Sequence, residues 1–593
     1  MQYVLDRFAA EIRAALAATG LIADDEIDLA EPKANVPADL ALPCFKAAKR
    51  RGVAPPRLAQ ELAAALSFGP DSLVGGVQAV GPFLNFTLNR AEFVRQTIAE
   101  ILRLGERYGS DDRGAGQTVI VEYSSPNIAK RMHVGHIRST IIGQAINNLL
   151  TFLGYHTIAD NHLGDYGTQF GTMIAAMERF GRPEGEGEAV LAAIEERYAR
   201  YNQLKGMAAD DEAHDPEALD EEARAWSLKL EQGDPYAREL WQWMVDTTLR
   251  ANQRAYDRLG VRFDTQHGES FYAEMLPQVI AEAERLPCVE REPGGALVVK
   301  GLRDTNGKEL PNFLIQRSDG ATLYITRDVA TIIYRERTYH PRRIIYVVGQ
   351  EQELHFRQTF ALARAMGYAR DIELIHVPFG RVFTADGQPL STRRGNMIYL
   401  ESLLDEAKAR ARAIIEQKIA EGKTELPAEQ IDELADAIGV GAVIYNDLYQ
   451  DPRRNITIDW ERMLAFEGNS APYLQYTHAR CCSILREAGI TTGAALPSVD
   501  PAVLEDEREV AVVKQLARFP EVVRRAGEQY APYVIADWLY ATAREFARFY
   551  RDLRVLNAPT PELRAARLQL VAATAQALRN GLRLLNIRAP ERM

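Results

Sequence analysis

The residues of this chain best suited to chemistry are two histidines on either side of a glycine, in the run His133-Val134-Gly135-His136. Glycine at that point lets a flat ring or a phosphate approach the backbone closely, because it has no side chain. The charged residues between positions 124 and 140 are all basic: Lys130, Arg131 and Arg138. Two imidazoles and a group of cations around one glycine predict a site for a phosphate-bearing molecule.

A strand, a tight loop and a helix have to position these residues. Thr118–Tyr123 is a short apolar run rich in β-branched side chains, which is typical of a buried parallel strand. Ser124–Met132 is polar and contains a proline, which predicts a loop. A helix then begins at His133, with apolar residues at every fourth position: Ile137, Ile141, Ala145 and Leu149. Doubly wound sheets present nucleotide sites in this way, since free N–H groups at a helix start bind phosphate.

The longer string around the histidines resembles the HIGH signature of class I aminoacyl-tRNA synthetases. The residues before it, Glu122-Tyr-Ser-Ser-Pro-Asn-Ile-Ala-Lys130, are similar to the version in arginyl-tRNA synthetases. This resemblance implies that His133 and His136 hydrogen-bond the phosphates of ATP and that Gly135 admits its adenine or ribose. Small nucleotidylyltransferases carry a similar histidine pair on the same kind of sheet and are the competing interpretation.

A second candidate site lies in the run Tyr324-Ile-Thr-Arg-Asp328 and in Gly349-Gln-Glu-Gln352. Thr322–Thr326 is typical of a strand, and an acid that follows a strand end lies where doubly wound sheets bind ligands. Taken alone, Asp328 is more simply a helix cap. The family resemblance implies instead that five residues bind the substrate arginine: Glu122, Asn127, Tyr324, Asp328 and Gln352. A carboxylate suits this role because it can pair with a guanidinium through two parallel hydrogen bonds.

The run Pro389-Leu390-Ser391-Thr392-Arg393 resembles the KMSKS loop of the same class in a degenerate form. By itself it predicts only a polar turn. The resemblance implies that Ser391 and Thr392 bind ATP and that Arg393 assists catalysis. Both lysines of the family's loop are missing here, so Lys130 is expected to neutralise the leaving pyrophosphate in their place. The alternative is that Lys130 is an ordinary solvated lysine.

Composition and charge limit the remaining possibilities. A chain of 593 residues that is 47% hydrophobic and 26% charged is expected to be globular, with about four domains. Asp6, Arg7 and Glu11 interrupt the N-terminal apolar run, which predicts an amphipathic helix and not a signal peptide, so a cytoplasmic protein without membrane spans is expected. The formal charge of −12 argues against a protein that coats polyanions, although a local basic surface can still bind nucleic acid.

The cysteines have neither disulfide nor zinc-ligand spacing: Cys44, Cys288, Cys481 and Cys482. No protein-bound metal is therefore expected, apart from the Mg²⁺ that accompanies ATP.

The predicted fold class is α/β, with a Rossmann-like doubly wound parallel sheet in the catalytic domain. An N-terminal α/β domain precedes it and an all-α helical bundle follows it. The expected domains are 1–114, 115–400 with a helical insertion at about 184–259, a helical connecting region at 401–460, and 461–593. The expected strands are 80–88 in the first domain and, besides 118–123 and 322–326, the segments 155–162, 296–302, 343–349 and 373–379 in the second.

The resemblance also implies contacts with tRNA at both ends of the chain. The first domain would contact the elbow of the tRNA, and the last would bind the anticodon, where aromatic side chains can stack on unpaired bases. The candidate residues are Phe83, Asn85, Tyr473, Tyr476, Arg480 and Met593. An ordinary buried strand and helix-core tyrosines are the alternative interpretations of the aromatic positions.

The resemblance covers the full chain and implies an arginyl-tRNA synthetase. Such an enzyme joins L-arginine to ATP as arginyl-adenylate, releases pyrophosphate, and transfers the arginine to the 3′ end of tRNA(Arg). The expected partners are ATP, arginine and tRNA, and the expected state is a monomer. Two alternatives are a nucleotidylyltransferase and a synthetase-like RNA-binding paralogue that has lost activation. The first leaves both flanking domains unexplained, and the second is favoured by the degenerate loop at 389–393.

Overall fold

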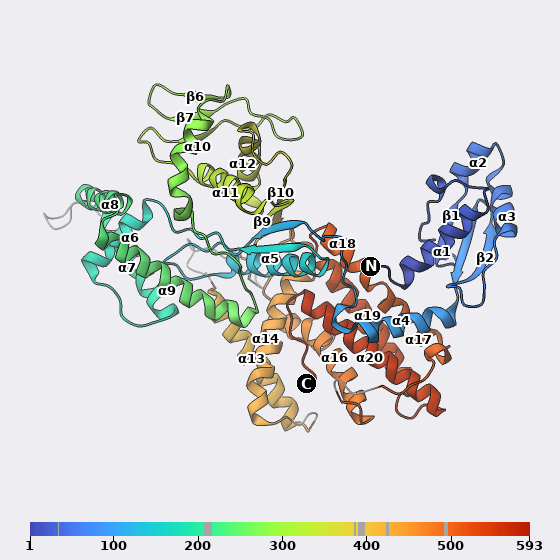
Figure 1. Ribbon diagram of the computed structural model, residues 1–593. Coiled ribbons are helices and arrows are strands. Elements are labelled where there is room, and N and C mark those ends of the chain that lie inside the picture. Colours follow the sequence, from blue (N-terminus) through green and yellow to red (C-terminus); the bar gives the residue numbers. More distant parts are fainter. Residues whose placement is uncertain (34, 207–215, 385–386, 389–397, 423–425, 492–495) are drawn as a thin grey trace.

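The computed structural model describes residues 1–593 except 34, 207–215, 385–386, 389–397, 423–425 and 492–495. At its centre is a parallel sheet in the order β10-β9-β4-β5 (Figure 1). Its strands are β4 Thr118–Glu122, β5 His156–Asp160, β9 Arg343–Gly349 and β10 Glu373–Phe379. These strands confirm the four that were predicted at 118–123, 155–162, 343–349 and 373–379. The next strand in the chain after β4, β5, lies on one side of β4, and the later strand β9 lies on the other side. This reversal of the strand order places the crevice for a ligand between β4 and β9.

Helices cover both faces of this sheet, which explains the continuous apolar run in β4. Val119 and Val121 share a core with α5 (Val134–Phe152), whereas Ile120 shares a core with Ile332 of α11 (Tyr324–Tyr339) on the other face. Successive strand residues point to opposite faces, so a strand covered on both sides is apolar at every position. Helix α12 (Glu353–Ala365) packs against α11 on that second face.

Two of the predicted strands were wrong in type or place. Residues 322–326 do not form a strand, because α11 begins at Tyr324 and the hydroxyl of Thr326 donates to the Ile315 carbonyl at 2.6 Å. Residues 296–302 contain β7 (Leu297–Val299), which pairs with β6 (Val289–Arg291) and β8 (Phe313–Gln316) in a separate antiparallel sheet. The connection between β6 and β7 is too short for a parallel crossover, and the connection between β7 and β8 contains no helix that could make one.

The predicted insertion is helical, as expected. It contains α7 (Glu188–Gly206), α8 (Pro216–Glu231) and α9 (Pro235–Leu259), which pack with α6 (Gln169–Phe180) around their own apolar core. Asp234 caps the start of α9 by accepting from the N–H groups of the first turn, and Gly260 ends it with φ of 69°. Such caps satisfy the N–H and C=O groups that a helix end leaves free.

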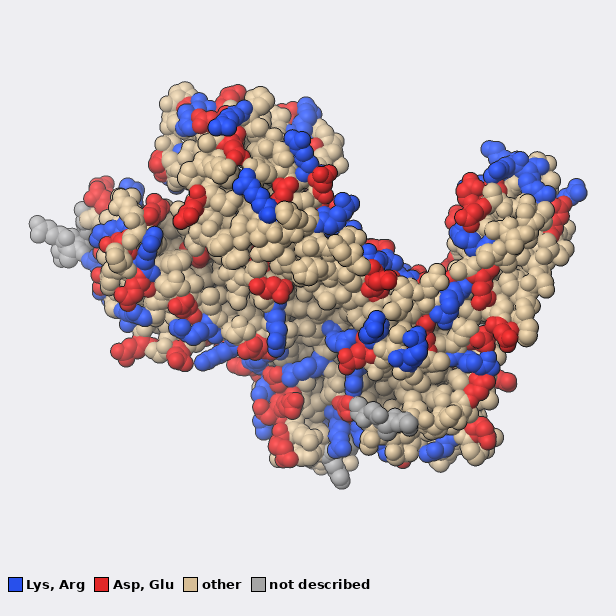
Figure 2. Space-filling model, in the orientation of Figure 1, with Lys and Arg blue, Asp and Glu red and all other residues tan. Residues whose placement is uncertain are grey.

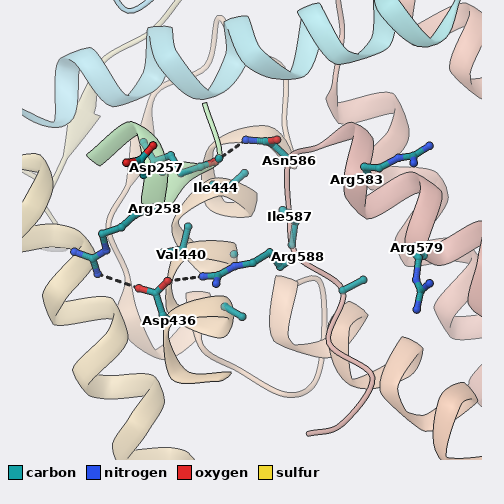
Figure 3. A pocket seen from close by; sticks show the side chains of 15 residues that line it. Asp257, Arg258, Asp436, Val440, Ile444, Arg579, Arg583, Asn586, Ile587 and Arg588 are labelled. Atoms are coloured by element: carbon teal, nitrogen blue, oxygen red, sulfur yellow. Dashed lines mark hydrogen bonds and ion pairs between the residues drawn. The ribbon is translucent and has the colours of Figure 1, made fainter. Parts of the chain in front are cut away.

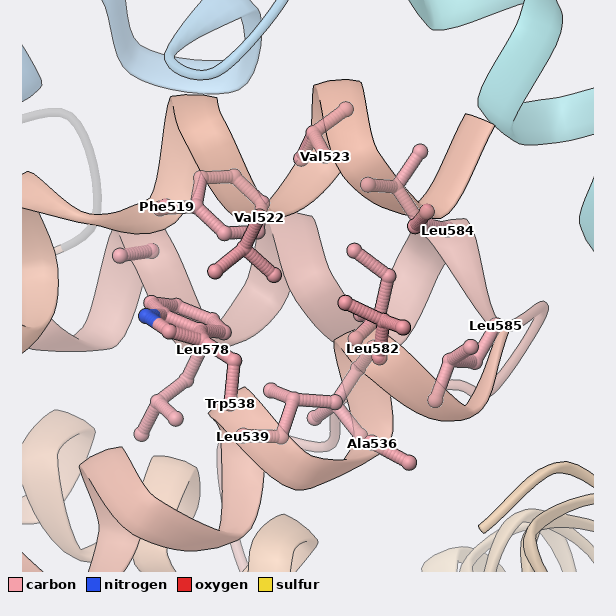
Figure 4. Close-up of a cluster of buried hydrophobic side chains, with 14 of the residues drawn as sticks. Phe519, Val522, Val523, Ala536, Trp538, Leu539, Leu578, Leu582, Leu584 and Leu585 are labelled. Atoms are coloured by element: carbon pink, nitrogen blue, oxygen red, sulfur yellow. The ribbon is translucent and has the colours of Figure 1, made fainter. Parts of the chain in front are cut away.

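From Leu400 onward the described chain is almost entirely helical. Its longer helices are α13 Leu400–Ala420, α14 Ala428–Leu448, α16 Ala471–Glu487, α17 Glu507–Ala517, α18 Phe519–Glu528, α19 Tyr533–Asp552 and α20 Pro561–Leu584. The apolar stripe predicted for the last helix is buried: Val571, Ala575, Leu578, Leu582 and Leu585. Figure 4 shows Leu578 and Leu582 packed with Trp538, Leu539 and Phe519 in the core of this bundle.

The N-terminal module stands apart from the catalytic sheet (Figure 1). It contains α1 Val4–Ala18, α2 Phe45–Arg51, α3 Pro55–Ala65 and an antiparallel sheet of β1 Leu40–Pro43, β2 Val74–Val80 and β3 Phe83–Leu88. The strand predicted at 80–88 is wrong at its start, because a turn at Gly81 separates β2 from β3. Helix α4 (Arg90–Leu104) packs against α17 and α20 of the C-terminal bundle.

Among the described residues, no helix has both the length and the apolar character needed to cross a bilayer.

Candidate active site

The loop between β4 and α5 has an unusual backbone. Ser124, Ser125 and Ala129 have φ values of 71°, 49° and 63°, a conformation that side chains other than glycine adopt at a cost of about 1 kcal/mol or more each. A side-chain oxygen accepts a hydrogen bond from each of these three N–H groups. The acceptor is Ser139 for Ser124 at 3.0 Å, Asn161 for Ser125 at 3.1 Å, and Thr248 for Ala129 at 2.9 Å. The loop is therefore fixed by contacts from three separate elements, which is a common feature of functional sites.

The two histidines stand at the start of α5 and brace one another. The Gly135 N–H donates to Nδ1 of His133 at 3.1 Å, and the His133 N–H donates to Nδ1 of His136 at 3.2 Å. The ring centres are 4.1 Å apart. In both rings Nδ1 accepts a hydrogen bond, so the proton of the neutral imidazole lies on Nε2. Both Nε2–H groups are thus fixed as donors beside the helix N-terminus.

Burial and nearby positive charge keep these imidazoles neutral. Burial lowers the pKa of His133, and the Lys130 ammonium lowers it further. Burial, His133 and Lys130 together lower the pKa of His136 to about 3. Neutral imidazoles can donate hydrogen bonds to phosphate oxygens at physiological pH without first gaining a proton.

The predicted group of cations is divided among different tasks. Arg138 is fully buried and pairs with Asp447 of α14 at 3.0 Å, so it faces the core and not the site. Arg131 pairs with Glu195 of α7 at 2.9 Å and lies over the Tyr399 ring. Lys130 is half-buried, and no hydrogen bond or ion pair joins it to the described residues. Lys130 is therefore the cation of this loop that is available to a ligand.

The helical insertion supports the loop from one side. Glu195 of α7 accepts from both the backbone and the side chain of Arg131, and Thr248 of α9 accepts from the Ala129 N–H. These contacts place Lys130 between two anchored neighbours.

Of the five residues predicted to bind arginine, two are acids, Glu122 and Asp328. Glu122 ends β4, where burial raises its pKa and the negative charge of Asp328 contributes to the rise. Asp328 lies in the second turn of α11, where its carboxylate accepts from His355 Nε2 at 2.5 Å. Both descriptions of Asp328 from the sequence, as an acid after a strand end and as a helix cap, were wrong, since Leu323 occupies the N-cap position.

The other three predicted arginine-binding residues are more exposed. Asn127 is exposed in the β4–α5 loop, and its side-chain oxygen lies against Gly164. Tyr324 is 63% exposed at the start of α11. Gln352 is exposed in the turn between β9 and α12. All three lie on segments that follow strand ends or begin helices beside the crevice.

Sequence reasoning missed two charged residues at this end of the sheet. Arg335 of α11 is buried and pairs with Glu122 at 2.6 Å and with Asp160, the last residue of β5. The available signals were weak. Arg335 follows Asp328 by two helical turns, and Asp160 is an acid at the end of a predicted strand.

Ser391, Thr392 and Arg393 lie outside the described residues. The chain that follows them is anchored at the histidines, because the Val134 N–H donates to Ile398 and the Leu400 N–H donates to Met132. The described residues contain no group of histidine, cysteine or acidic side chains arranged to hold a metal ion.

The predicted tRNA-contacting residues differ in exposure. Phe83 is 40% exposed and meets the exposed Phe45 edge to face at 5.8 Å, whereas Asn85 is buried. Tyr473 and Tyr476 are half-buried, and the Arg480 guanidinium lies 4.7 Å from the Tyr476 ring centre. Met593 is half-buried against the bundle.

A cavity of about 590 Å³ lies where the helical insertion meets the C-terminal bundle (Figure 3). The end of α9, α14 and the end of α20 line it, and Asp436 bridges Arg258 at 3.2 Å and Arg588 at 2.5 Å. Asn586 also donates to the Leu259 carbonyl at 2.6 Å. This cavity joins the insertion to the C-terminal bundle and contains none of the predicted site residues.

Comparison with known proteins agrees with this architecture. The family described as tRNA synthetases class I (R), catalytic domain, matches residues 97–460. A DALR anticodon binding domain matches 474–593, and an arginyl tRNA synthetase N terminal domain matches 6–88. The parallel sheet, the paired histidines and these matches define a class I aminoacyl-tRNA synthetase. Within that class, the chain belongs to the arginyl-tRNA synthetase family.

Individual relatives extend over the whole chain. Arginine–tRNA ligases from Chloroflexus aggregans and Chloroflexus aurantiacus are 58% and 59% identical, and each alignment covers all of both chains. The structure of Thermus thermophilus arginyl-tRNA synthetase aligns with a TM-score of 0.78 and 27% identity over 99% of this chain and all of the other. The Plasmodium falciparum arginyl-tRNA synthetase, at 21% identity, shares the fold with a TM-score of 0.76 over both full chains.

The lowered histidine pKa gives a prediction for stability against pH. An unfolded His136 takes up a proton near pH 6.5, whereas the folded residue does so only at about 3. As the pH falls between these values the unfolded state therefore gains protons and the protein loses stability. We expect the melting temperature of His136→Gln to fall less between pH 7 and pH 4.5 than the melting temperature of the unmutated protein. His156→Gln, at an exposed position, is the control. Equal losses in all three proteins would contradict the neutral state of His136.

Proposed function

We propose that this site activates L-arginine with ATP and passes the arginyl group to tRNA(Arg), as an arginine–tRNA ligase. The arginine carboxylate attacks the α-phosphate of ATP, the bond to the leaving pyrophosphate breaks, and arginyl-adenylate forms. The terminal ribose hydroxyl of the tRNA then attacks the arginyl carbonyl, and AMP leaves. The observation that carries this proposal is the pair of neutral histidines at the start of α5, whose Nδ1 atoms accept backbone hydrogen bonds and whose Nε2–H groups are left for phosphate, next to Lys130.

Arginine specificity follows from the charge of this crevice. Asp328 provides a carboxylate for the guanidinium, and Glu122 provides one for the ammonium group. Asn127, Tyr324 and Gln352 supply polar contacts around them. A neutral amino acid would leave the Asp328 carboxylate with its His355 hydrogen bond but without the guanidinium, and a desolvated charge that lacks its full complement of partners costs several kcal/mol.

ATP binding uses the start of α5. The Nε2–H groups of His133 and His136 donate to phosphate oxygens, and they do so more strongly as negative charge grows in the transition state. A side chain at Gly135 would lie 2.9 Å from the His133 ring, so glycine keeps the ring in place and leaves room for the nucleotide. Mg²⁺ arrives bound to ATP, in keeping with the preference of this ion for phosphate oxygens.

Charge on the leaving pyrophosphate is neutralised by Lys130. Its availability among the described residues and its effect on the pKa of both histidines support this role. Arg393 assists, and Ser391 and Thr392 bind ATP; these three roles rest on the family resemblance alone.

The partner tRNA spans both ends of the molecule. The tip of the N-terminal module is basic over α2, where Lys46, Lys49, Arg50 and Arg51 gather beside Phe45 and Phe83 (Figure 2). At the other end, Arg480 lies between the rings of Tyr476 and Tyr550. Exposed rings next to cations suit unpaired bases and their phosphates. Tyr473 and Met593, which are half-buried, and Asn85, which is buried next to Phe83 in β3, are assigned to tRNA contacts on the family resemblance alone, and the enzyme acts as a cytoplasmic monomer.

The reaction is tested by arginine-dependent exchange of labelled pyrophosphate into ATP, with and without tRNA(Arg). We expect exchange that requires arginine and that increases with tRNA, since docking of tRNA at both ends favours the competent state of the site. Exchange that depends on another acceptor in place of arginine would indicate a nucleotidylyltransferase. Binding of tRNA without any exchange would indicate a paralogue that has lost activation.

Replacing Asp328 by Asn should impair arginine use selectively. The amide keeps the shape of the side chain but loses the charge that pairs with the guanidinium. We expect the KM for arginine to rise by about 10²- to 10³-fold, the scale for a desolvated charge left unpaired, while the KM for ATP changes little. Asp319→Asn, at an exposed residue paired with Arg317, is the matched control. An unchanged arginine KM in Asp328→Asn would rule out this pocket.

Replacing Lys130 by Ala should slow adenylation by about 10²- to 10³-fold, the scale for losing one fixed charge-stabilising donor. The measurement is the rate of arginyl-adenylate formation in a single turnover. Adding Thr392→Lys should restore part of the rate by returning a lysine to the loop. Lys308→Ala removes an exposed lysine elsewhere and serves as the control. Near-normal adenylation by Lys130→Ala would show that Lys130 is only a solvated loop residue.

A further inference from the structure

Three buried charged residues meet where two neighbouring strands of the parallel sheet end. The Arg335 guanidinium pairs with Glu122 at the end of β4, at 2.6 Å, and with Asp160 at the end of β5. The side chains of these residues are at most 8% exposed. Glu122 and Asp160 are direct partners in the β4–β5 register, so one guanidinium spans both carboxylates.

The charges of this cluster do not balance. Two carboxylates face one guanidinium, which leaves a buried excess of one negative charge. Burial raises the pKa of Glu122, and the charge of Arg335 opposes that rise. Removing the guanidinium would leave two like charges in a desolvated place, which favours proton uptake by one of them. Arg335 therefore holds both carboxylates in place and opposes proton uptake by Glu122.

The cluster lies next to the proposed arginine pocket. Asp328 and Arg335 are seven residues apart on α11, which puts them on the same face two turns apart. His162, two residues beyond Asp160, gives an independent sign that a ligand belongs here. His162 as a residue is only 9% exposed, and neither ring nitrogen has a hydrogen-bond partner among the described residues. Buried polar atoms are nearly always bonded, so an unbonded pair in a crevice indicates a missing partner.

We propose that Arg335 is a positioning residue for the amino acid substrate. It fixes Glu122 and Asp160 as one anionic floor whose excess negative charge receives the cationic arginine, and it does not itself touch the reacting atoms. This inference rests on the proposed function, because it assumes that arginine is the amino acid bound. A purely structural ion pair would instead affect folding and leave substrate affinity unchanged.

Asp160→Asn is the sharpest test, because it preserves side-chain volume and leaves Arg335 paired with Glu122. The excess negative charge is then lost, and we expect the KM for arginine in pyrophosphate exchange to rise by about 10- to 100-fold, the range for losing one bond to a charged group. The KM for ATP should stay within about threefold, since the histidine site is untouched. Arg335→Lys should give a smaller rise, because an ammonium keeps the positive charge and has donors for both carboxylates but lacks the rigid planar fork of the guanidinium.

A double variant separates charge from shape. Arg335→Met removes the guanidinium, and adding Asp160→Asn returns the cluster to one negative charge on Glu122. We expect the double variant to bind arginine more weakly than the unmutated enzyme, as measured by calorimetry, although both clusters carry one negative charge, because Glu122 is no longer held by Arg335.

The control is Arg567→Lys, which alters a buried pair with Glu509 in the C-terminal bundle, at 2.7 Å. It should lower the melting temperature without changing either KM.

The outcomes distinguish the two proposals. If the unmutated enzyme shows no arginine-dependent exchange, the proposed function fails. If it does show exchange but Asp160→Asn and Arg335→Lys keep the arginine KM within about twofold, or raise both KM values equally, the positioning role fails. Should Arg335→Met not fold, Asp160→Asn still decides, since it removes no cation and creates no cavity.

Discussion

The buried guanidinium of Arg138 joins α5, the helix that carries the two histidines, to α14. It donates to the Asp447 carboxylate of α14 and to the carbonyls of Pro452 and Arg454, at 3.0 to 3.1 Å. Burial raises the pKa of Asp447, and the Arg138 charge opposes the rise. Removing one partner of such a pair costs about 3–5 kcal/mol, because the other is left buried and uncompensated. The helix that presents the histidines therefore cannot move without α14.

Pairing of cations with acids also organises the site itself. Cations that position the backbone are paired with acids, as Arg131 is with Glu195, while Lys130 between them and the histidines is left for the substrate. The neutral histidines fit this arrangement. A protonated imidazole next to Lys130 would add repulsion in a buried place, and the lowered pKa of both rings avoids it. Within the described loop at 124–132, unpaired positive charge is thus concentrated in the Lys130 ammonium group, next to the positive end of the helix dipole.

The sequence was sufficient where local pattern and tertiary environment agree. Strand β4, its loop and α5 were predicted because an apolar run, a proline-containing loop and a four-residue repeat each favour the structure that the fold requires. The prediction of a strand at 322–326 failed for the opposite reason. The β-branched residues of this segment favour a strand, but Ile325 and Val329 share a core with Leu297 and Ile315 that only a helix allows. The pairing of Arg335 with Asp160 had no local signature, since the partners are far apart in the chain.

These differences bear on how the amino acid is recognised. On a helix, Asp328 is held by the backbone hydrogen bonds of that helix and by His355. Burial lowers the pKa of His355, but the hydrogen bond to Asp328 and the charge of Asp328 together raise it above its ordinary value. A loop acid after a strand would lack that support and could turn away when no substrate is bound. Because α11 also carries Arg335, one rigid helix sets the Asp328 carboxylate and, through Arg335, the carboxylates at two strand ends. In the proposed arginine pocket, the selectivity for a long cation then follows from the packing of α11 against the sheet.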